Sequence, residues 1–184
     1  MGYNVTACGI FPGENVKTEG DPPMERKSKI NYYLDIAQTV TTRGTCLRKH
    51  FGAIIVRNDV IVSTGYNGAP RGRQNCCDMG DCLRDRLKIP RGERYELCRS
   101  VHAEANAIIS ASRENMLGAD LYLCCVDPAT GDLVSGTTSC QMCKRLVINA
   151  GIRRVIVREN EEDFTVYNVE DWVTNDDSLG QMGY

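Results

Sequence analysis

The sequence CQMCKRLVINAGIRRVIV, residues 140–157, carries the features that decide the predicted fold. Its first part predicts a helix from about Cys140 to Ala150, and Gly151 is the type of residue that ends a helix. The stretch 154–157 that follows is apolar and β-branched, so it predicts a buried strand. A helix that leads directly into such a strand is typical of a βαβ arrangement.

The same order of helix and strand occurs upstream of this stretch, and a hairpin precedes both. Periodicity and turn residues together predict these elements. They are helices over 28–44, 101–112 and 140–150, hairpin strands over 52–56 and 60–64, and strands over 121–126 and 154–157. Strands that alternate with helices indicate an α/β fold, with a mixed sheet covered by helices on both faces.

The length of 184 residues suits one domain. Residues 1–27 hold glycine and proline clusters without an apolar period, and we expect a loose N-terminal arm there. Residues 28–184 then form a single domain. Within it, residues 71–99 are rich in arginine, cysteine and glycine and lack periodicity, which predicts an irregular excursion from the core.

Composition excludes several classes of partner. The net charge of −2 argues against a nucleic-acid partner, because phosphate backbones demand basic surfaces. The sequence contains no apolar run near the roughly 20 residues of a membrane span, and the N-terminus lacks the apolar segment of a secretory signal. We therefore predict a cytoplasmic protein. In that compartment its ten cysteines favour metal binding over disulfides.

Four residues in two segments carry the predicted chemistry. His102, Cys140 and Cys143 are good zinc ligands, and a helix start stabilises the thiolate form of cysteine. Three protein ligands leave the fourth tetrahedral position open, as in catalytic rather than structural zinc sites. Glu104 lies two residues beyond His102, so it can stand beside the metal and move protons without being a ligand.

These segments match the H-x-E and P-C-x-x-C pattern of zinc deaminases. The chain resembles the deoxycytidylate (dCMP) deaminases of the cytidine deaminase superfamily, including the bacterial competence-operon type. The resemblance spans about residues 30–157 and rests on motifs that occur in the family's order. They are GAIIV (52–56), STGYNGAP (63–70), VHAEANAI (101–108), Cys140-x-x-Cys143 and AGI (150–152).

The resemblance implies zinc-dependent hydrolysis of dCMP to dUMP and ammonia, a step in pyrimidine deoxynucleotide metabolism. It also implies a three-layer α/β/α sandwich with a five-stranded mixed sheet, and a homo-oligomer, often a hexamer, that dCTP activates and dTTP inhibits. For the substrate it implies that Asn67 binds the deoxyribose 3'-hydroxyl, that the Ala103 amide contacts the base carbonyl, and that Arg48 binds the phosphate.

Two further features concern the metal sites. Ser139 precedes the first ligand cysteine where the superfamily usually has proline, which leaves the zinc ligands intact but changes the loop. Some family members hold a second zinc, and the resemblance places Cys46 and Cys76 there. With Cys82 and Cys98 substituting for the family's histidines, we predict a second, structural zinc. The alternative is that these cysteines are buried apolar residues or surface thiols.

Two other functions share part of the pattern. A deaminase of nucleic-acid bases, such as the tRNA adenosine type, also has H-x-E and C-x-x-C. The negative net charge of the chain opposes this function. A non-catalytic zinc protein of DNA uptake is the other alternative. Glu104 opposes that function, because a structural zinc needs no proton shuttle.

Overall fold

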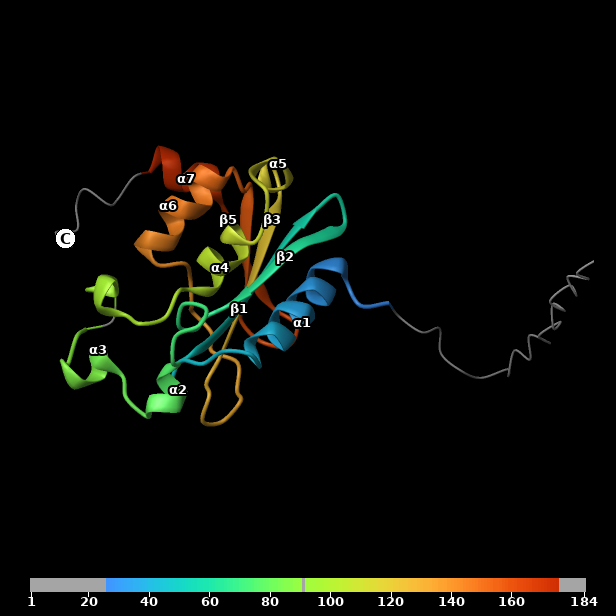
Figure 1. The fold of residues 1–184 in the computed structure, drawn as a ribbon. Coiled ribbons are helices and arrows are strands. Elements are labelled where there is room, and N and C mark those ends of the chain that lie inside the picture. The colour runs from blue at the N-terminus through green and yellow to red at the C-terminus, as the bar shows by residue number, and fades with distance from the viewer. Residues whose placement is uncertain (1–25, 91, 176–184) are drawn as a thin grey trace, which may run out of the picture.

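Five strands form one mixed sheet in the order β2-β1-β3-β4-β5 in the computed structural model, which describes residues 26–90 and 92–175 (Figure 1). Strand β1 is antiparallel to β2 and β3, β3 is parallel to β4, and β4 is antiparallel to β5. The strands are β1 (His50–Arg57), β2 (Val60–Tyr66), β3 (Asp120–Val126), β4 (Arg154–Arg158) and β5 (Phe164–Asn168).

Helices cover both faces of this sheet. The main ones are α1 (Lys29–Thr41), α4 (Ala103–Ile109), α6 (Gln141–Ala150) and α7 (Val169–Thr174). Helix α1 packs on one face, while α4, α6 and α7 contribute to the apolar core on the other (Figure 1). The predicted three-layer α/β/α sandwich with a five-stranded mixed sheet is confirmed. None of the helices in the described ranges is long and apolar enough to cross a membrane.

Local sequence explains the first three elements. The Ser28 hydroxyl accepts a hydrogen bond from the Asn31 amide at 3.2 Å and so caps α1. The turn between β1 and β2 places Asn58 and Asp59 at φ of 50° and 66°, which asparagine and aspartate tolerate better than most residues. The Tyr33 hydroxyl donates to the Asp59 carboxylate at 2.7 Å, so α1 and the hairpin are joined at that turn.

Strand β3 lies in the middle of the sheet, and all seven of its residues are buried. Burial on both faces is typical of a strand that has a parallel neighbour and helices on either side. Helix α6 makes the connection from β3 to the parallel strand β4 and ends at Gly151, whose φ of 77° suits glycine. The predicted order of strand, helix and strand is therefore correct.

Two predictions need correction. The helix expected over 101–112 is shorter, because α4 ends at Ile109 and the Ser112 side chain caps a separate helix, α5 (Arg113–Met116). Residues 164–174, whose apolar side chains predict one short terminal packing element, form both β5 and α7. Of the predicted loose arm, residues 1–25 lie outside the described ranges.

The excursion at 71–99 holds only short elements, α2 (Cys76–Met79), α3 (Leu83–Arg86) and a 3-10 turn (Tyr95–Leu97). Arg84 is 5% exposed and organises part of this segment. Its guanidinium donates to the carbonyl oxygens of Pro90 and Glu93, at 2.8 and 2.6 Å. It also lies over the Tyr95 ring, 4.5 Å from the ring centroid. The excursion is thus held in part by a buried cation rather than by an apolar core.

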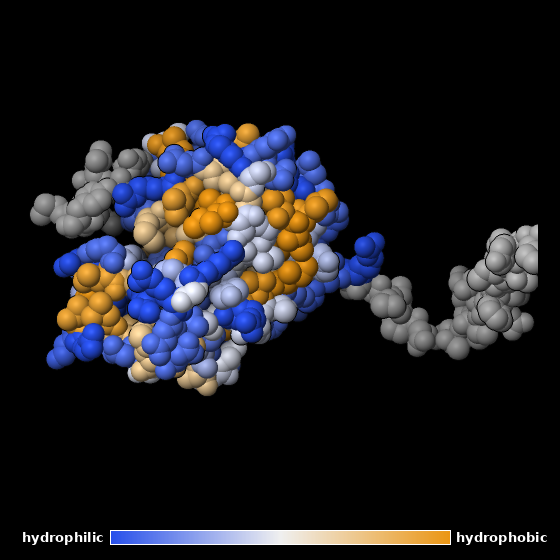
Figure 2. Space-filling view, viewed as in Figure 1, coloured by the Kyte–Doolittle hydropathy of each residue, from blue (hydrophilic) through white to orange (hydrophobic). Residues whose placement is uncertain are grey.

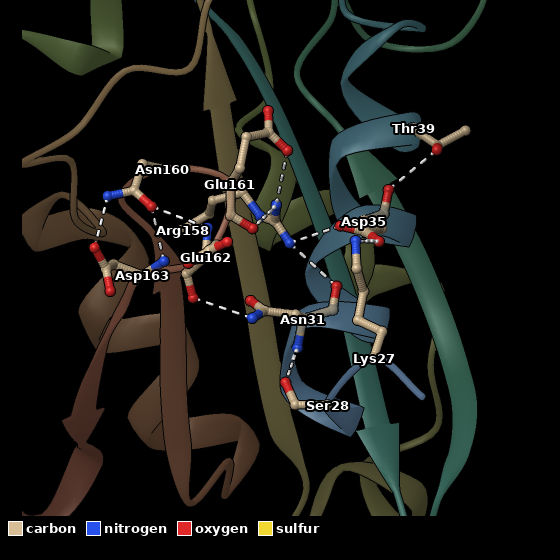
Figure 3. A network of polar contacts seen from close by, with 10 residues as sticks. All are labelled: Lys27, Ser28, Asn31, Asp35, Thr39, Arg158, Asn160, Glu161, Glu162 and Asp163. Carbon is tan, nitrogen blue, oxygen red and sulfur yellow. Dashed lines mark hydrogen bonds and ion pairs between the residues drawn. The ribbon is translucent and has the colours of Figure 1, made fainter. Parts of the chain in front are cut away.

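A second buried arginine joins the end of β4 to α1 (Figure 3). Arg158 is 1% exposed. It donates to the Asp35 carboxylate at 2.8 Å and to the carbonyl oxygens of Asn31 and Glu161 at 3.1 and 3.2 Å. The Asn31 side chain in turn donates to the Glu162 carbonyl at 3.0 Å, so the β4–β5 turn is tied to α1 at two places.

We expect Arg158→Ala to destabilise the fold by about 3 kcal/mol, because it removes the buried partner of Asp35 and two backbone carbonyls. Urea unfolding followed by circular dichroism measures the change. Lys29→Ala is the control, since it breaks an exposed ion pair with Asp59 and should leave the midpoint nearly unchanged. Equal midpoints for Arg158→Ala and wild type would contradict the assigned role.

Candidate active site

The predicted zinc ligands lie together at the starts of two helices. His102 is the N-cap residue of α4, Cys140 is that of α6, and Cys143 lies in the first turn of α6. The Nδ1 atom of His102 is 3.4 Å from the Sγ atoms of both cysteines. Within residues 26–90 and 92–175, no other group of three or more histidine, cysteine or carboxylate side chains has donor atoms that all lie within 4.8 Å of one another.

The position of α4 depends on Gly65 in β2. A Cβ atom at Gly65 would lie 2.3 Å from both the Ala103 oxygen and the Ala107 nitrogen, so only glycine permits this approach. Two hydrogen bonds fix the same contact. Ser63 Oγ donates to the Ala107 oxygen at 2.8 Å, and Asn106 Nδ2 donates to the Tyr66 oxygen at 2.7 Å. The helix that begins at the zinc-ligand histidine is therefore seated directly on the sheet.

The electrostatics of the cysteine pair suit a metal ligand set. A hydrogen bond from Cys143 is the largest influence that lowers the pKa of the Cys140 thiol, to about 4, against the opposing effect of burial. The same contact raises the pKa of Cys143. The thiolate is the form of cysteine that binds zinc, and an imidazole with two cysteine sulfurs is a donor set that zinc prefers. The residues present thus fit the predicted ion.

Glu104 occupies the second position of α4 and is 4% exposed. Burial raises the pKa of its carboxyl group, and the positive charge of His102 opposes that shift. Its carboxylate is not part of the three-residue donor group. The Glu104 side chain interacts with that of Cys143, so the carboxyl group lies beside the donor group without belonging to it. Its catalytic role stays a prediction.

The site opens into a cavity of about 690 Å³, large enough for a nucleotide. Glu104, His102 and Cys140 line it, together with the three predicted substrate contacts, Asn67, Ala103 and Arg48.

The two predicted side-chain contacts to substrate already have partners. Asn67 accepts from the Phe51 amide and donates to the Lys49 oxygen, both at 2.8 Å, which fixes its side chain. Arg48 pairs with Asp85 at 3.2 Å, and about a third of its side chain is exposed. Asn67 is thus held at the cavity wall, whereas Arg48 is tied to the excursion.

The four cysteines of the predicted second zinc site lie near one another but are not gathered as ligands. Burial raises the pKa of Cys76, and Cys46, Cys98 and Cys82 act on it in the same direction. No three of these sulfurs lie within 4.8 Å of one another. The second zinc therefore stays a prediction.

Sequence reasoning missed the contact between the excursion and a zinc ligand. The Tyr95 ring meets the His102 ring edge-on, with the centroids 4.9 Å apart and the planes at 89°. The Cys98 side chain also interacts with His102 and acts to raise its pKa. One tyrosine in a segment without periodicity gives no signal of its partner, so only the spatial arrangement could reveal this contact.

Comparison with known proteins agrees with the geometry. Residues 27–159 match the family described as the cytidine and deoxycytidylate deaminase zinc-binding region. The deoxycytidylate deaminase of Mycobacterium phage D29 is 34% identical over 139 residues, which cover 72% of this chain and 96% of that protein. The chain belongs to the deoxycytidylate deaminase family. The resemblance inferred from the motifs is thus confirmed, and with it membership of a family of zinc-dependent deaminases.

Other similar proteins differ more in length. The deoxycytidylate deaminase of Schizosaccharomyces pombe is 30% identical over 82% of this chain, but the match spans only 41% of that protein. ComE operon protein 2 of Bacillus subtilis is 30% identical over 83% of this chain and 65% of that protein. The apo dCMP deaminase of cyanophage S-TIM5 superimposes with a TM-score of 0.50 at 25% identity, over 72% of this chain and 85% of that one.

We expect Cys143→Ser to lose about one zinc ion per chain relative to wild type, because it replaces a buried ligand sulfur. Metal analysis of the purified proteins measures the difference. Cys77→Ser is the matched control, since that thiol is exposed and belongs to neither predicted metal site. Unchanged zinc in Cys143→Ser would show that the ligands are assigned wrongly.

Proposed function

We propose that this protein hydrolyses dCMP to dUMP and ammonia. The observation that carries the proposal is the buried carboxyl group of Glu104, which lies beside a His/Cys/Cys donor set and is not part of it. The cavity at this site suits a nucleotide in size. The names of the similar yeast and phage proteins further support dCMP as the substrate.

The proton transfers fall to Glu104. When bound, zinc supplies the Lewis acidity that makes a water molecule nucleophilic near neutral pH. The Glu104 carboxylate accepts a proton from the attacking water and gives it to the ring nitrogen beside the amine-bearing carbon. The oxygen bonds to that carbon, the amine takes up a proton through Glu104, and the carbon–nitrogen bond breaks to release ammonia. Burial, which raises the pKa of this carboxyl group, suits a group that takes and returns a proton.

Three residues around the cavity would bind the rest of the nucleotide. Asn67 retains capacity for a further hydrogen bond beyond its two backbone contacts, so it can bind the 3'-hydroxyl. The Ala103 amide, in the first turn of α4, would contact the base carbonyl. The Arg48 guanidinium would bind the 5'-phosphate and exchange its contact with Asp85 for the ligand.

The second zinc belongs to the same proposal. Cys46, Cys76, Cys82 and Cys98 would hold it, and small movements of the excursion would bring the sulfurs to bonding distance. Its role would be structural, because four cysteine ligands leave no position for water. In the metal analysis of the wild-type chain, about two zinc ions support this site and about one would refute it.

The apolar surface supports a homo-oligomer. Figure 2 shows apolar surface over α4, α6 and β2, where exposed residues include Ile109, Leu146 and Val60, at 75%, 38% and 63% exposure. Exposed apolar patches of this kind mark protein interfaces. We propose that a second copy of the chain covers this face. A hexamer that dCTP activates and dTTP inhibits is the form that the family resemblance implies.

The proposed setting is the cytoplasm, with a free nucleotide rather than nucleic acid as the partner. The ten cysteines of the chain suit the reducing cytosol, where thiols persist and can bind metal. The net charge of −2 supports a small substrate over a phosphate backbone.

Glu104→Gln is expected to lower kcat for dCMP by about a thousandfold, because the amide cannot carry the proton. Zinc content and circular dichroism should match wild type. Ultraviolet absorbance follows turnover of dCMP, dCTP, deoxycytidine and CMP, each with and without dCTP or dTTP as effector. If the wild-type protein deaminates none of these free nucleotides, the proposed function is wrong. If Glu104→Gln keeps wild-type activity, Glu104 does not carry the proton.

Arg48→Ala should lower kcat/KM for dCMP by about 30-fold while changing that for deoxycytidine little, since only dCMP offers the phosphate. Arg113→Ala, an exposed arginine outside the cavity, is the matched control and should leave both values unchanged. Equal losses on the two substrates would exclude Arg48 as the phosphate ligand.

A further inference from the structure

The Ser139 side chain is buried but lacks a hydrogen-bond partner. Its residue is 1% exposed, and its Oγ atom forms no hydrogen bond to any residue in the described part of the chain. Buried hydroxyl groups nearly always have hydrogen-bond partners, because an unpaired one has lost its hydrogen bonds to water and gained none in the protein. Since Ser139 directly precedes the zinc ligand Cys140, the direction of this hydroxyl matters for the site.

The hydroxyl lies close enough to the Glu104 carboxyl group to interact with it. Both residues line the active-site cavity. Burial raises the pKa of the Glu104 carboxyl group, and the Ser139 side chain acts against that shift. Ser100 provides a contrast within the same cavity. Its buried Oγ also lacks a hydrogen-bond partner, but it interacts with the Cys76 thiol instead. The two buried, unpartnered hydroxyls thus interact with different groups, and of the two only that of Ser139 interacts with the Glu104 carboxyl group.

Serine also changes what position 139 can do. The proline that the family resemblance implies there would fix φ and stiffen the loop, but it offers no side-chain donor. Serine gives up that stiffness and supplies a hydroxyl that can donate to a carboxylate. A glutamate has three side-chain torsions, so a donor on one of its oxygens narrows the positions that the other can reach.

We propose that Ser139 is a positioning residue whose hydroxyl donates a hydrogen bond to one Glu104 oxygen and leaves the other oxygen free to move protons. The inference rests on the proposed deamination of dCMP. A hydroxyl with a purely structural role would instead bond to the backbone, as the neighbouring Thr137 hydroxyl does to the Val134 oxygen, at 3.5 Å.

Kinetics of three variants test the role. Ser139→Ala should lower kcat for dCMP about tenfold, with KM within about twofold and zinc content unchanged, because substrate binding and metal ligands stay intact. Ser139→Thr keeps the hydroxyl and should restore kcat to within about threefold of wild type. Ser135→Ala is the matched control, since this exposed serine of the same loop lies outside the cavity, and it should retain wild-type values. A Ser139→Ala enzyme with wild-type kcat, or a Ser139→Thr enzyme as slow as it, would overturn the inference.

A crystal structure of the zinc-loaded wild type supplies a readout that needs neither turnover nor a variant. Ser139 Oγ should lie about 2.5–3.0 Å from a Glu104 carboxylate oxygen. A separation above about 3.5 Å, or a bond to a backbone group instead, would overturn the inference. Because this distance does not depend on activity, failure to deaminate dCMP would refute the proposed function separately.

Discussion

The close approach of α4 to β2 at Gly65 is the constraint on which the site depends. Any side chain there would meet the backbone of Ala103 and Ala107 and push the helix outward. Because His102 is the N-cap residue of this helix and Glu104 lies in its first turn, such a shift would move the proposed zinc ligand and the proposed proton carrier together. A residue without a side chain, on a strand outside the metal site, thus sets the geometry of the chemistry.

The two halves of the metal site come from helices that reach it independently. The α4 half depends on contact with β2, whereas the α6 half depends on the crossover from β3 to β4. Neither helix by itself supplies the three ligands of the proposed site, since α4 offers one imidazole and α6 offers two thiols. Metal binding therefore reports that the sheet is correctly assembled, and it stabilises that assembly in return.

Local patterns predicted most of the fold and the ligand set, because capping, periodicity and metal-ligand spacing are short-range properties. Ser28, the hairpin turn and Gly151 lie where those signals place them. What sequence could not supply depends on contacts between distant residues. The partners of Arg84 and Arg158, the edge-on contact of Tyr95 with His102, and the unpartnered buried hydroxyl of Ser139 have no local signature. The cap at Ser112 was a local signal that the longer apolar period concealed.

The excursion and the zinc site form one unit through His102. Arg84 closes the loop that leads to Tyr95, its guanidinium packs over the Tyr95 ring, and that ring packs against the imidazole. A metal held by His102 would restrict the imidazole and with it the contact to Tyr95, since a ligating histidine is oriented by the groups that pack around it. Ordering of this loop and occupancy of the site must therefore favour each other, so the segment with the least regular structure contributes to the accuracy of the catalytic centre.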